Sequence, residues 1–75
     1  MISYQIPENQ MVNLEIYNAL GQKVRTLVNK EQQAGYYNLE WDGKNDFGGS
    51  VTSGVYFYRI HTDNFTKVMK MMLLK

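Results

Sequence analysis

Side chains that could bind a metal ion are concentrated in the glycine-containing segment 41–54. Asp42, Asn45 and Asp46 lie close together and carry the oxygen ligands that calcium prefers. A calcium loop needs oxygen ligands at alternate positions and a glutamate at its end, but Lys44 occupies one of these positions and the glutamate is missing. The spacing therefore favours turns that Asp42 and Asn45 close through their own side chains, and we expect no metal ion here.

The chain has too few residues of the kinds that bind zinc or catalyse hydrolysis to form either kind of site. His61 is the single histidine and the chain has no cysteine, so the ligands of a tetrahedral zinc site are lacking. Ser3, Ser50 and Ser53 have no base at a recognisable spacing. We expect a protein without enzymatic activity and without a cofactor.

Two further kinds of ligand site are suggested by residue type. Gly48 and Gly49 do not connect a strand to a helix, so they are predicted to be turn residues and not a phosphate cradle. An exposed row of aromatic rings would suit sugar binding. Alternation nevertheless assigns most of these rings to the core and leaves only Tyr36, Tyr17 and Phe57 partly outside. The aromatic set is Tyr36, Tyr37, Trp41, Tyr56, Phe57 and Tyr58.

The segments that must position these residues are predicted to be strands. Apolar and polar residues alternate with a period of two, most clearly at Val12, Leu14 and Ile16. Pro7 ends the first strand because it has no N–H group to donate. The expected strands are residues 2–6, 12–17, 23–30, 36–41, 55–60 and 65–74.

One segment allows two interpretations. Residues 22–33 contain good helix formers, with Val24, Leu27 and Val28 at helical spacing. A strand is favoured because every neighbouring segment is a strand and the turn at 18–21 suggests a hairpin. The adjacent apolar residues Leu27 and Val28 then predict a bulge.

Length, composition and charge restrict the class of protein. The chain has 75 residues, eight Lys plus Arg against seven Asp plus Glu, and a net charge of +1. Scattered basic residues do not suggest a nucleic-acid partner. The longest apolar run, 71–74, is too short for a membrane span, and the opening residues lack the features of a signal peptide. If the protein leaves the cytoplasm, the signal for this first step is therefore expected on a segment before Met1.

Short strands with turn signals between them predict an all-β fold. We expect a small antiparallel Ig-like β-sandwich of about six to seven strands, with a small barrel as the alternative. No internal repeat or linker is visible, so residues 1–75 are expected to form a single domain.

The last expected strand, 65–74, is unusually rich in apolar residues. Lys67, Lys70 and Lys75 are spaced along it. Charges at such intervals protect an edge strand from aggregation. Two interpretations remain: a buried last strand, or a terminus that another protein recognises, for instance by edge pairing.

An ordered set of residues over nearly the whole chain supports a family resemblance. The sequence resembles the C-terminal type A sorting domain of the bacterial type IX secretion system, which is similar to the Ig-like domain of the flagellar hook-capping protein. The terminal segment from Lys70 to Lys75 distinguishes the sorting type. The remaining shared positions are Ile16, Tyr17, Asn18, Gly21, Gly35, Trp41, Asp42, Gly43, Asp46, Gly48, Val51, Gly54 and Tyr56.

The resemblance implies a non-catalytic address attached to a secreted cargo protein. Such a domain follows its cargo in the chain, is recognised by the outer-membrane export machinery, and accompanies the cargo through the periplasm to the bacterial surface or the medium. The alternative is an accessory sandwich, either carbohydrate-binding or structural, attached to a secreted enzyme. A weak homodimer through edge strands is also expected. The residues expected to carry recognition are Lys70, Met71, Met72, Leu73, Leu74 and Lys75.

Overall fold

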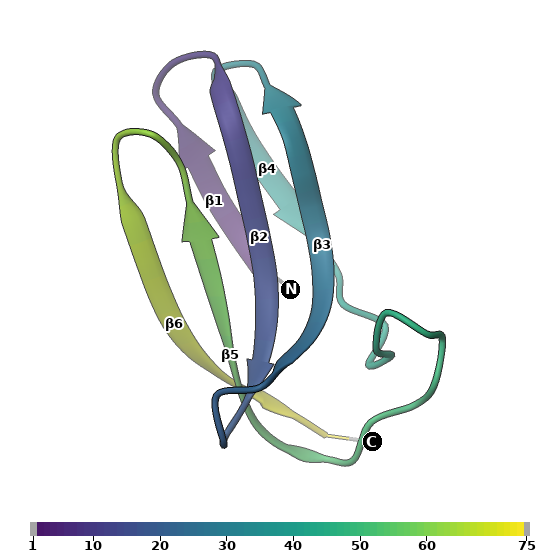
Figure 1. The fold of residues 1–75 in the computed structure, drawn as a ribbon. Coiled ribbons are helices and arrows are strands. Elements are labelled where there is room, and N and C mark those ends of the chain that lie inside the picture. The colour runs from purple at the N-terminus through teal and green to yellow at the C-terminus, as the bar shows by residue number, and fades with distance from the viewer. Residues whose placement is uncertain (1, 75) are drawn as a thin grey trace.

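Every regular element between residues 2 and 74, the part of the chain that this computed structural model describes, is a β-strand (Figure 1). The predicted all-β fold is confirmed, and none of the described residues forms a helix long and apolar enough to cross a membrane. The six strands are β1 (Ile2–Ile6), β2 (Gln10–Asn18), β3 (Lys23–Gln32), β4 (Gly35–Leu39), β5 (Gly54–His61) and β6 (Thr66–Leu73).

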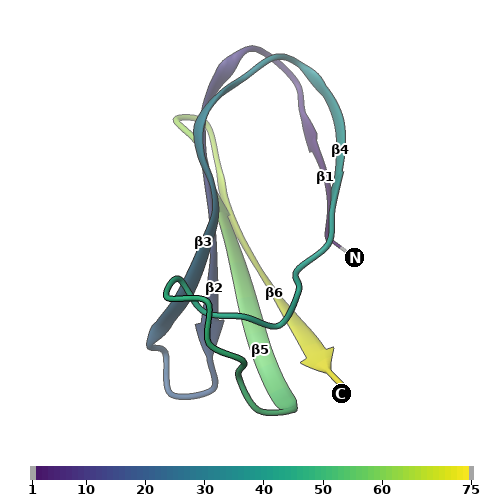
Figure 2. The same cartoon turned by 90° about the vertical axis from the view of Figure 1, so that its right-hand side faces the viewer.

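The strands form two sheets of unequal width. The larger sheet has four strands in the order β3-β2-β5-β6, and the smaller consists of β1 and β4; every pairing is antiparallel. Figure 2 shows the two layers edge on, with β1 and β4 facing the larger sheet. The sandwich prediction is therefore confirmed and the closed barrel is excluded.

The core lies between the layers and is supplied mainly by β2. Val12, Leu14 and Ile16 are completely buried, as their alternation predicted. The smaller sheet contributes Ile2 and Ile6 from β1, both almost inaccessible to solvent. The other buried apolar residues are Val28, Tyr56 and Ile60.

Residues 22–33 form a strand, and the helical alternative is wrong. The β2–β3 register pairs Leu14 with Val28 but Glu15 with Thr26, which leaves Leu27 as an extra residue on β3. This is the predicted bulge. Because the bulge shifts the alternation by one position, both Val28 and Leu27 pack on the core. A second irregularity between Ile16 and Tyr17 was not predicted.

Trp41 lies beyond the end of β4, although the predicted strand extended to it. Its ring packs edge-on against Tyr56, with centroids 5.0 Å apart, and its indole N–H donates to the Lys44 carbonyl at 2.9 Å. Trp41 thus joins the start of the long β4–β5 loop to the core. β4 itself ends at Leu39, and the side-chain hydrogen bonds to the loop backbone begin at Lys44.

Candidate functional site

The β4–β5 loop uses its polar side chains to close turns. Asp42 Oδ1 accepts the Lys44 N–H at 3.0 Å and lies 3.1 Å from the Arg25 guanidinium. Asn45 Oδ1 accepts the N–H groups of Phe47 and Gly49, both at 2.9 Å. The turn roles predicted for Asp42 and Asn45 are confirmed. Within residues 2–74, no group of three His, Cys, Asp or Glu side chains is arranged to hold a metal ion.

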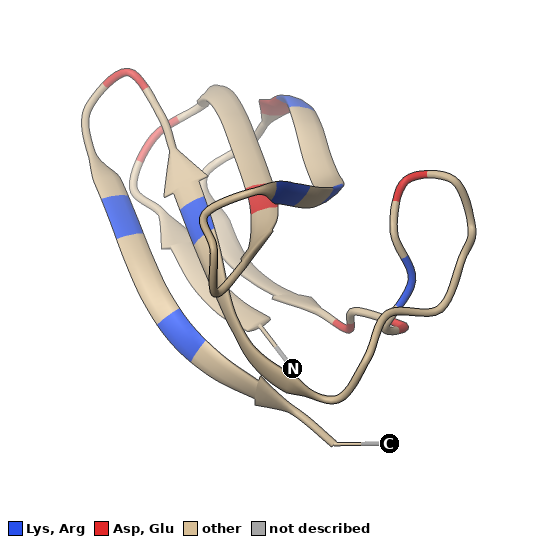
Figure 3. Cartoon of the chain, turned by 60° about the horizontal axis from the view of Figure 1, so that its bottom comes forward, with Lys and Arg blue, Asp and Glu red and all other residues tan. Residues whose placement is uncertain are grey.

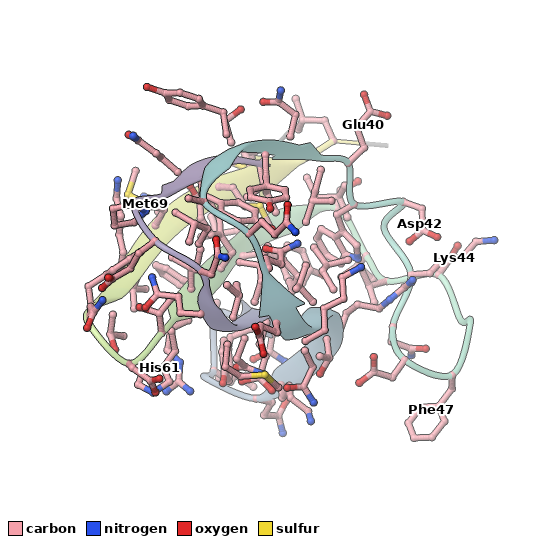
Figure 4. The ribbon with its side chains drawn as sticks, turned by 90° about the horizontal axis from the view of Figure 1, so that it is seen from above. Glu40, Asp42, Lys44, Phe47, His61 and Met69 are labelled. Carbon is pink, nitrogen blue, oxygen red and sulfur yellow. The ribbon has the colours of Figure 1, made fainter. Side chains whose placement is uncertain are left out.

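Asp46 has a different role, which the sequence analysis did not identify. Its carboxylate accepts the Thr26 N–H at 2.9 Å, and its own N–H donates to the Val24 carbonyl at 3.0 Å. Thr26 and Val24 belong to β3, the outermost strand on that side of the larger sheet. The loop therefore covers the outer edge of β3. Asp42, Lys44 and Phe47 accordingly lie together on one side of the molecule in Figure 4.

The candidate nucleophiles and the histidine contact different partners. His61 Nδ1 lies 2.6 Å from the Thr66 hydroxyl across the β5–β6 hairpin. Ser3 donates its hydroxyl to Asn38 Oδ1 at 2.7 Å on the smaller sheet. No hydrogen bond therefore connects His61 with Ser3 in the described structure, and we find no nucleophile–base pair between them.

Most of the aromatic residues pack on the core. Tyr56 is buried, and Tyr37 and Tyr58 are partly buried beside it. Tyr36 is 81% exposed, as predicted, and stands next to a hollow of about 310 Å³ on the smaller sheet. Asn38 supplies a polar group to that hollow. Tyr36 is the strongly exposed ring at this hollow, and Gln5 and Asn38 are the amides that line it; this is a smaller platform than a row of exposed rings.

The positions of the structural motif lie mostly in turns. Gly21 has φ 83° and its N–H donates to the Asn18 carbonyl at 3.0 Å, closing the β2–β3 hairpin. Tyr56 donates its hydroxyl to the Thr52 carbonyl at 2.7 Å, which ties β5 to the preceding loop. The glycines with positive φ are Gly21, Gly35, Gly43, Gly48 and Gly54.

Of the residues proposed for recognition, Lys70, Met71, Met72 and Leu73 lie on β6, at the edge of the larger sheet. Met71 and Leu73 are partly buried and pack against the core. Met72 is 61% exposed, and Leu74, just beyond the strand, is 81% exposed. Lys70 is exposed as well, whereas Lys75 lies outside the described residues. The interpretation of a buried last strand is therefore wrong, because the smaller sheet does not extend over β6.

A shallow apolar hollow of about 200 Å³ adjoins β6 on the outer face of the larger sheet, between Tyr17, Phe57 and Val68. The Arg59 guanidinium borders it, 5.9 Å from the Tyr17 ring centre and 3.7 Å from Glu15 Oε1. The hydrogen bond from Tyr17 to Glu15, at 2.7 Å, raises the pKa of Tyr17. Alternation indicated that Tyr17 and Phe57 face outward, but only the strand pairing brings them together with Val68.

Comparison with known proteins gives one match. The family model described as the FlgD Ig-like domain matches residues 2–64. No curated protein and no solved structure matches the chain. The matched range contains β1 to β5 and most of the β5–β6 turn, whereas β6 begins at Thr66 and lies beyond it.

Proposed function

Since the chain belongs to the FlgD Ig-like domain family, we propose that it is a non-catalytic sorting module built on this sandwich. In this proposal it follows a secreted cargo protein in the same chain and directs that cargo through the type IX secretion machinery. The partners are the covalently linked cargo and the outer-membrane export apparatus. The destination is the bacterial surface or the medium, reached through the periplasm.

The observation that carries the proposal is the position of the terminal apolar strand. β6 lies outside the matched range, occupies a sheet edge and presents Lys70 and Met72 to solvent; Leu74, just beyond the strand, is exposed as well. A large exposed apolar side chain at a sheet edge is costly for a small protein to maintain, because it invites aggregation. Its presence is accounted for if another protein recognises it.

A deletion tests this proposal directly. Removing residues 70–75 from the full cargo protein should leave the cargo in the periplasm, as measured by fractionation and immunoblotting. Unchanged export would contradict the sorting function.

A matched pair of point variants separates recognition from folding. Leu74→Ser and Leu20→Ser each replace an exposed leucine, 81% and 84% accessible respectively, so neither should disturb the core. Only Leu74→Ser should lower export. Equal export of the two variants would show that the Leu74 side chain is not recognised.

An accessory module is the second candidate, favoured by the hollow beside Tyr36. A ring face next to an amide is a feature that sugar-binding surfaces use. A glycan array with the isolated domain tests this candidate, with Tyr36→Ala as the control variant. Absence of binding at millimolar sugar would eliminate the carbohydrate function and leave a structural role.

A further inference from the structure

The rest of the chain covers one edge of the larger sheet and leaves the other edge open. Asp46 bonds to the backbone of β3 at one edge, through the contacts to Thr26 and Val24. Within residues 2–74 no loop or strand makes such contacts with the outer edge of β6. Figure 4 shows Met69 on the side of the molecule opposite the labelled loop residues. The larger sheet is therefore open at β6.

The backbone groups that face this opening follow from the β5–β6 ladder. The hairpin pair at its start is hydrogen bonded, because the Thr62 N–H donates to the Phe65 carbonyl at 2.9 Å. Bonded and non-bonded pairs alternate along an antiparallel ladder, and the register runs without a break to Leu73. The N–H groups of Val68, Lys70 and Met72 therefore point away from β5, toward the open edge.

Burial decreases steadily across the inner face of the larger sheet. In the cross-strand row that contains Ile16 and Tyr58, Ile16 on β2 is completely buried, Tyr58 on β5 is partly buried, and Met69 on β6 is 40% exposed. The two-stranded layer covers the centre of the larger sheet, so that on the inner side of β6 Met71 and Leu73 are only partly buried and Met69 is exposed. A strand added beyond β6 would place its own apolar side chains beside Met69.

The charge on β6 has one sign. Lys67 and Lys70 are its charged residues, and neither forms an ion pair with any described residue. Figure 3 shows these two basic positions along β6, with no acidic residue on the strand. Arg59, on the neighbouring strand, is already within 3.7 Å of Glu15. Lys67 pairs with Ile60 and lies on the inner face, whereas Lys70 pairs with Phe57 and lies on the outer face. A carboxylate on the outer face of an added strand would therefore find the unpaired ammonium group of Lys70.

We propose that the open edge of β6 binds an extended strand of a partner protein whose side chains are alternately acidic and apolar. The partner's backbone pairs with Val68, Lys70 and Met72. Its apolar side chains lie beside Met69 on the inner face, and its carboxylates lie on the outer face, where they neutralise Lys70. A second copy of this chain fits less well, since β6 carries no carboxylate that could pair with Lys70 of the other copy. The biological setting of the interaction rests on the proposed sorting function.

Hydrogen exchange tests the pairing with a defined probe. The probe is an eight-residue peptide as long as β6, with alternating Glu and Val, and its control has Lys in place of Glu. With the Glu peptide, exchange of the Val68, Lys70 and Met72 amides should slow by about tenfold or more. The amides of Met69 and Met71, which face β5, should change little. Equal protection by both peptides, or protection confined to another surface, would overturn the proposal.

A matched pair of variants tests the backbone contact. Lys70→Pro and Lys70→Ala both remove the ammonium group, but only proline removes the edge-facing N–H, and proline is tolerated at a sheet edge. Lys70→Ala should weaken peptide binding several-fold, by no more than about tenfold. Lys70→Pro should abolish binding. If Lys70→Pro does not fold, N-methylation of the Lys70 backbone nitrogen removes the same N–H while keeping the side chain. Undiminished binding to the methylated protein would contradict strand addition.

The same variants distinguish this inference from the sorting function. If cargo with Lys70→Pro is exported normally while cargo lacking residues 70–75 is retained, sorting stands and edge pairing is wrong. If the truncated cargo is exported, sorting fails whatever the peptide does in solution. Concentration-dependent dimerisation of the domain without peptide binding would assign the edge to a second copy and would overturn the acidic partner.

Discussion

Among single residues, Asp46 determines which edge of the larger sheet is open. Its carboxylate and N–H both bond to the β3 backbone, so the loop replaces a neighbouring strand there. The turn roles of Asp42 and Asn45 could be predicted from the sequence, because their side-chain oxygens accept hydrogen bonds from backbone N–H groups two to four residues away. The role of Asp46 could not, because Thr26 is 20 positions distant and is brought close only by the folded sheet.

Asp46→Ala should therefore destabilise the domain and loosen the β3 edge. The substitution removes a charge-assisted hydrogen bond from an exposed position, which contributes about 1 kcal/mol. Urea unfolding measures the loss, and exchange of the Thr26 amide should become faster. Glu40→Ala, which removes an exposed carboxylate with no described contact, should change stability by less than about 0.5 kcal/mol. An equal effect of the two substitutions would show that the Asp46 contact is not stabilising.

Tyr17 makes the stability of the fold depend on pH in the alkaline range. Its hydrogen bond to Glu15, its partial burial and the Glu15 charge raise its pKa above the ordinary 10.0, with Arg59 opposing them. A raised pKa in the folded state means that this contribution is fully present below pH 10 and is lost as the pH rises through the folded value.

Tyr17→Phe should accordingly flatten the alkaline decrease in stability. The free energy of unfolding, measured by urea titration from neutral pH to above pH 10, should fall more steeply for the wild type than for the variant. Tyr36→Phe controls for the removal of a tyrosine hydroxyl alone. Identical slopes for wild type and Tyr17→Phe would contradict the role given to the Glu15 contact.

Among the elements, β2 is the strand on which the core depends. It pairs with β3 on one side and β5 on the other, and its inward side chains are completely buried. The alternation of apolar residues predicted this strand well, because a strand buried on one face imposes that pattern directly. The pattern of β6 could not be interpreted in the same way, since alternation does not reveal whether an opposite sheet reaches the strand.

Leu14→Ala should therefore be severely destabilising. Removing a fully buried leucine side chain costs about 2–5 kcal/mol. A 75-residue domain has only about 4–11 kcal/mol of stability, so a large part would be lost. Leu20→Ala makes the same chemical change at an 84% exposed position and should alter stability by less than about 0.5 kcal/mol. Thermal unfolding followed by circular dichroism compares the two, and similar melting temperatures would refute this assignment of the core.

For the whole molecule, the unequal width of the two sheets links fold and proposed function. The strand count and the antiparallel sandwich were predictable from strand lengths and turns. The division into four strands and two was not, because it depends on which distant strands pair. That division leaves β6 uncovered, and the exposure of the terminal strand was thus beyond what local sequence patterns could predict.

The weak homodimer predicted from the sequence remains a prediction, for which β1, β4 and β6 each offer an edge without a neighbouring strand. Edge pairing of this kind should be concentration-dependent, and raising the salt concentration should strengthen it at β6 by screening Lys67 and Lys70. Size-exclusion chromatography at several protein and salt concentrations measures both effects. A single monomeric peak under all conditions would contradict the prediction of a homodimer.

Export of a reporter protein shows whether residues 1–75 act as a sorting signal. Residues 1–75 are fused to the C-terminus of a periplasmic reporter enzyme in a bacterium with a type IX secretion system, and reporter activity is measured in the medium and on the cell surface. We expect the reporter to leave the periplasm only when the domain is attached and the outer-membrane channel is intact. A folded fusion that stays in the periplasm of the secretion-competent strain would show that the domain is not a sorting signal.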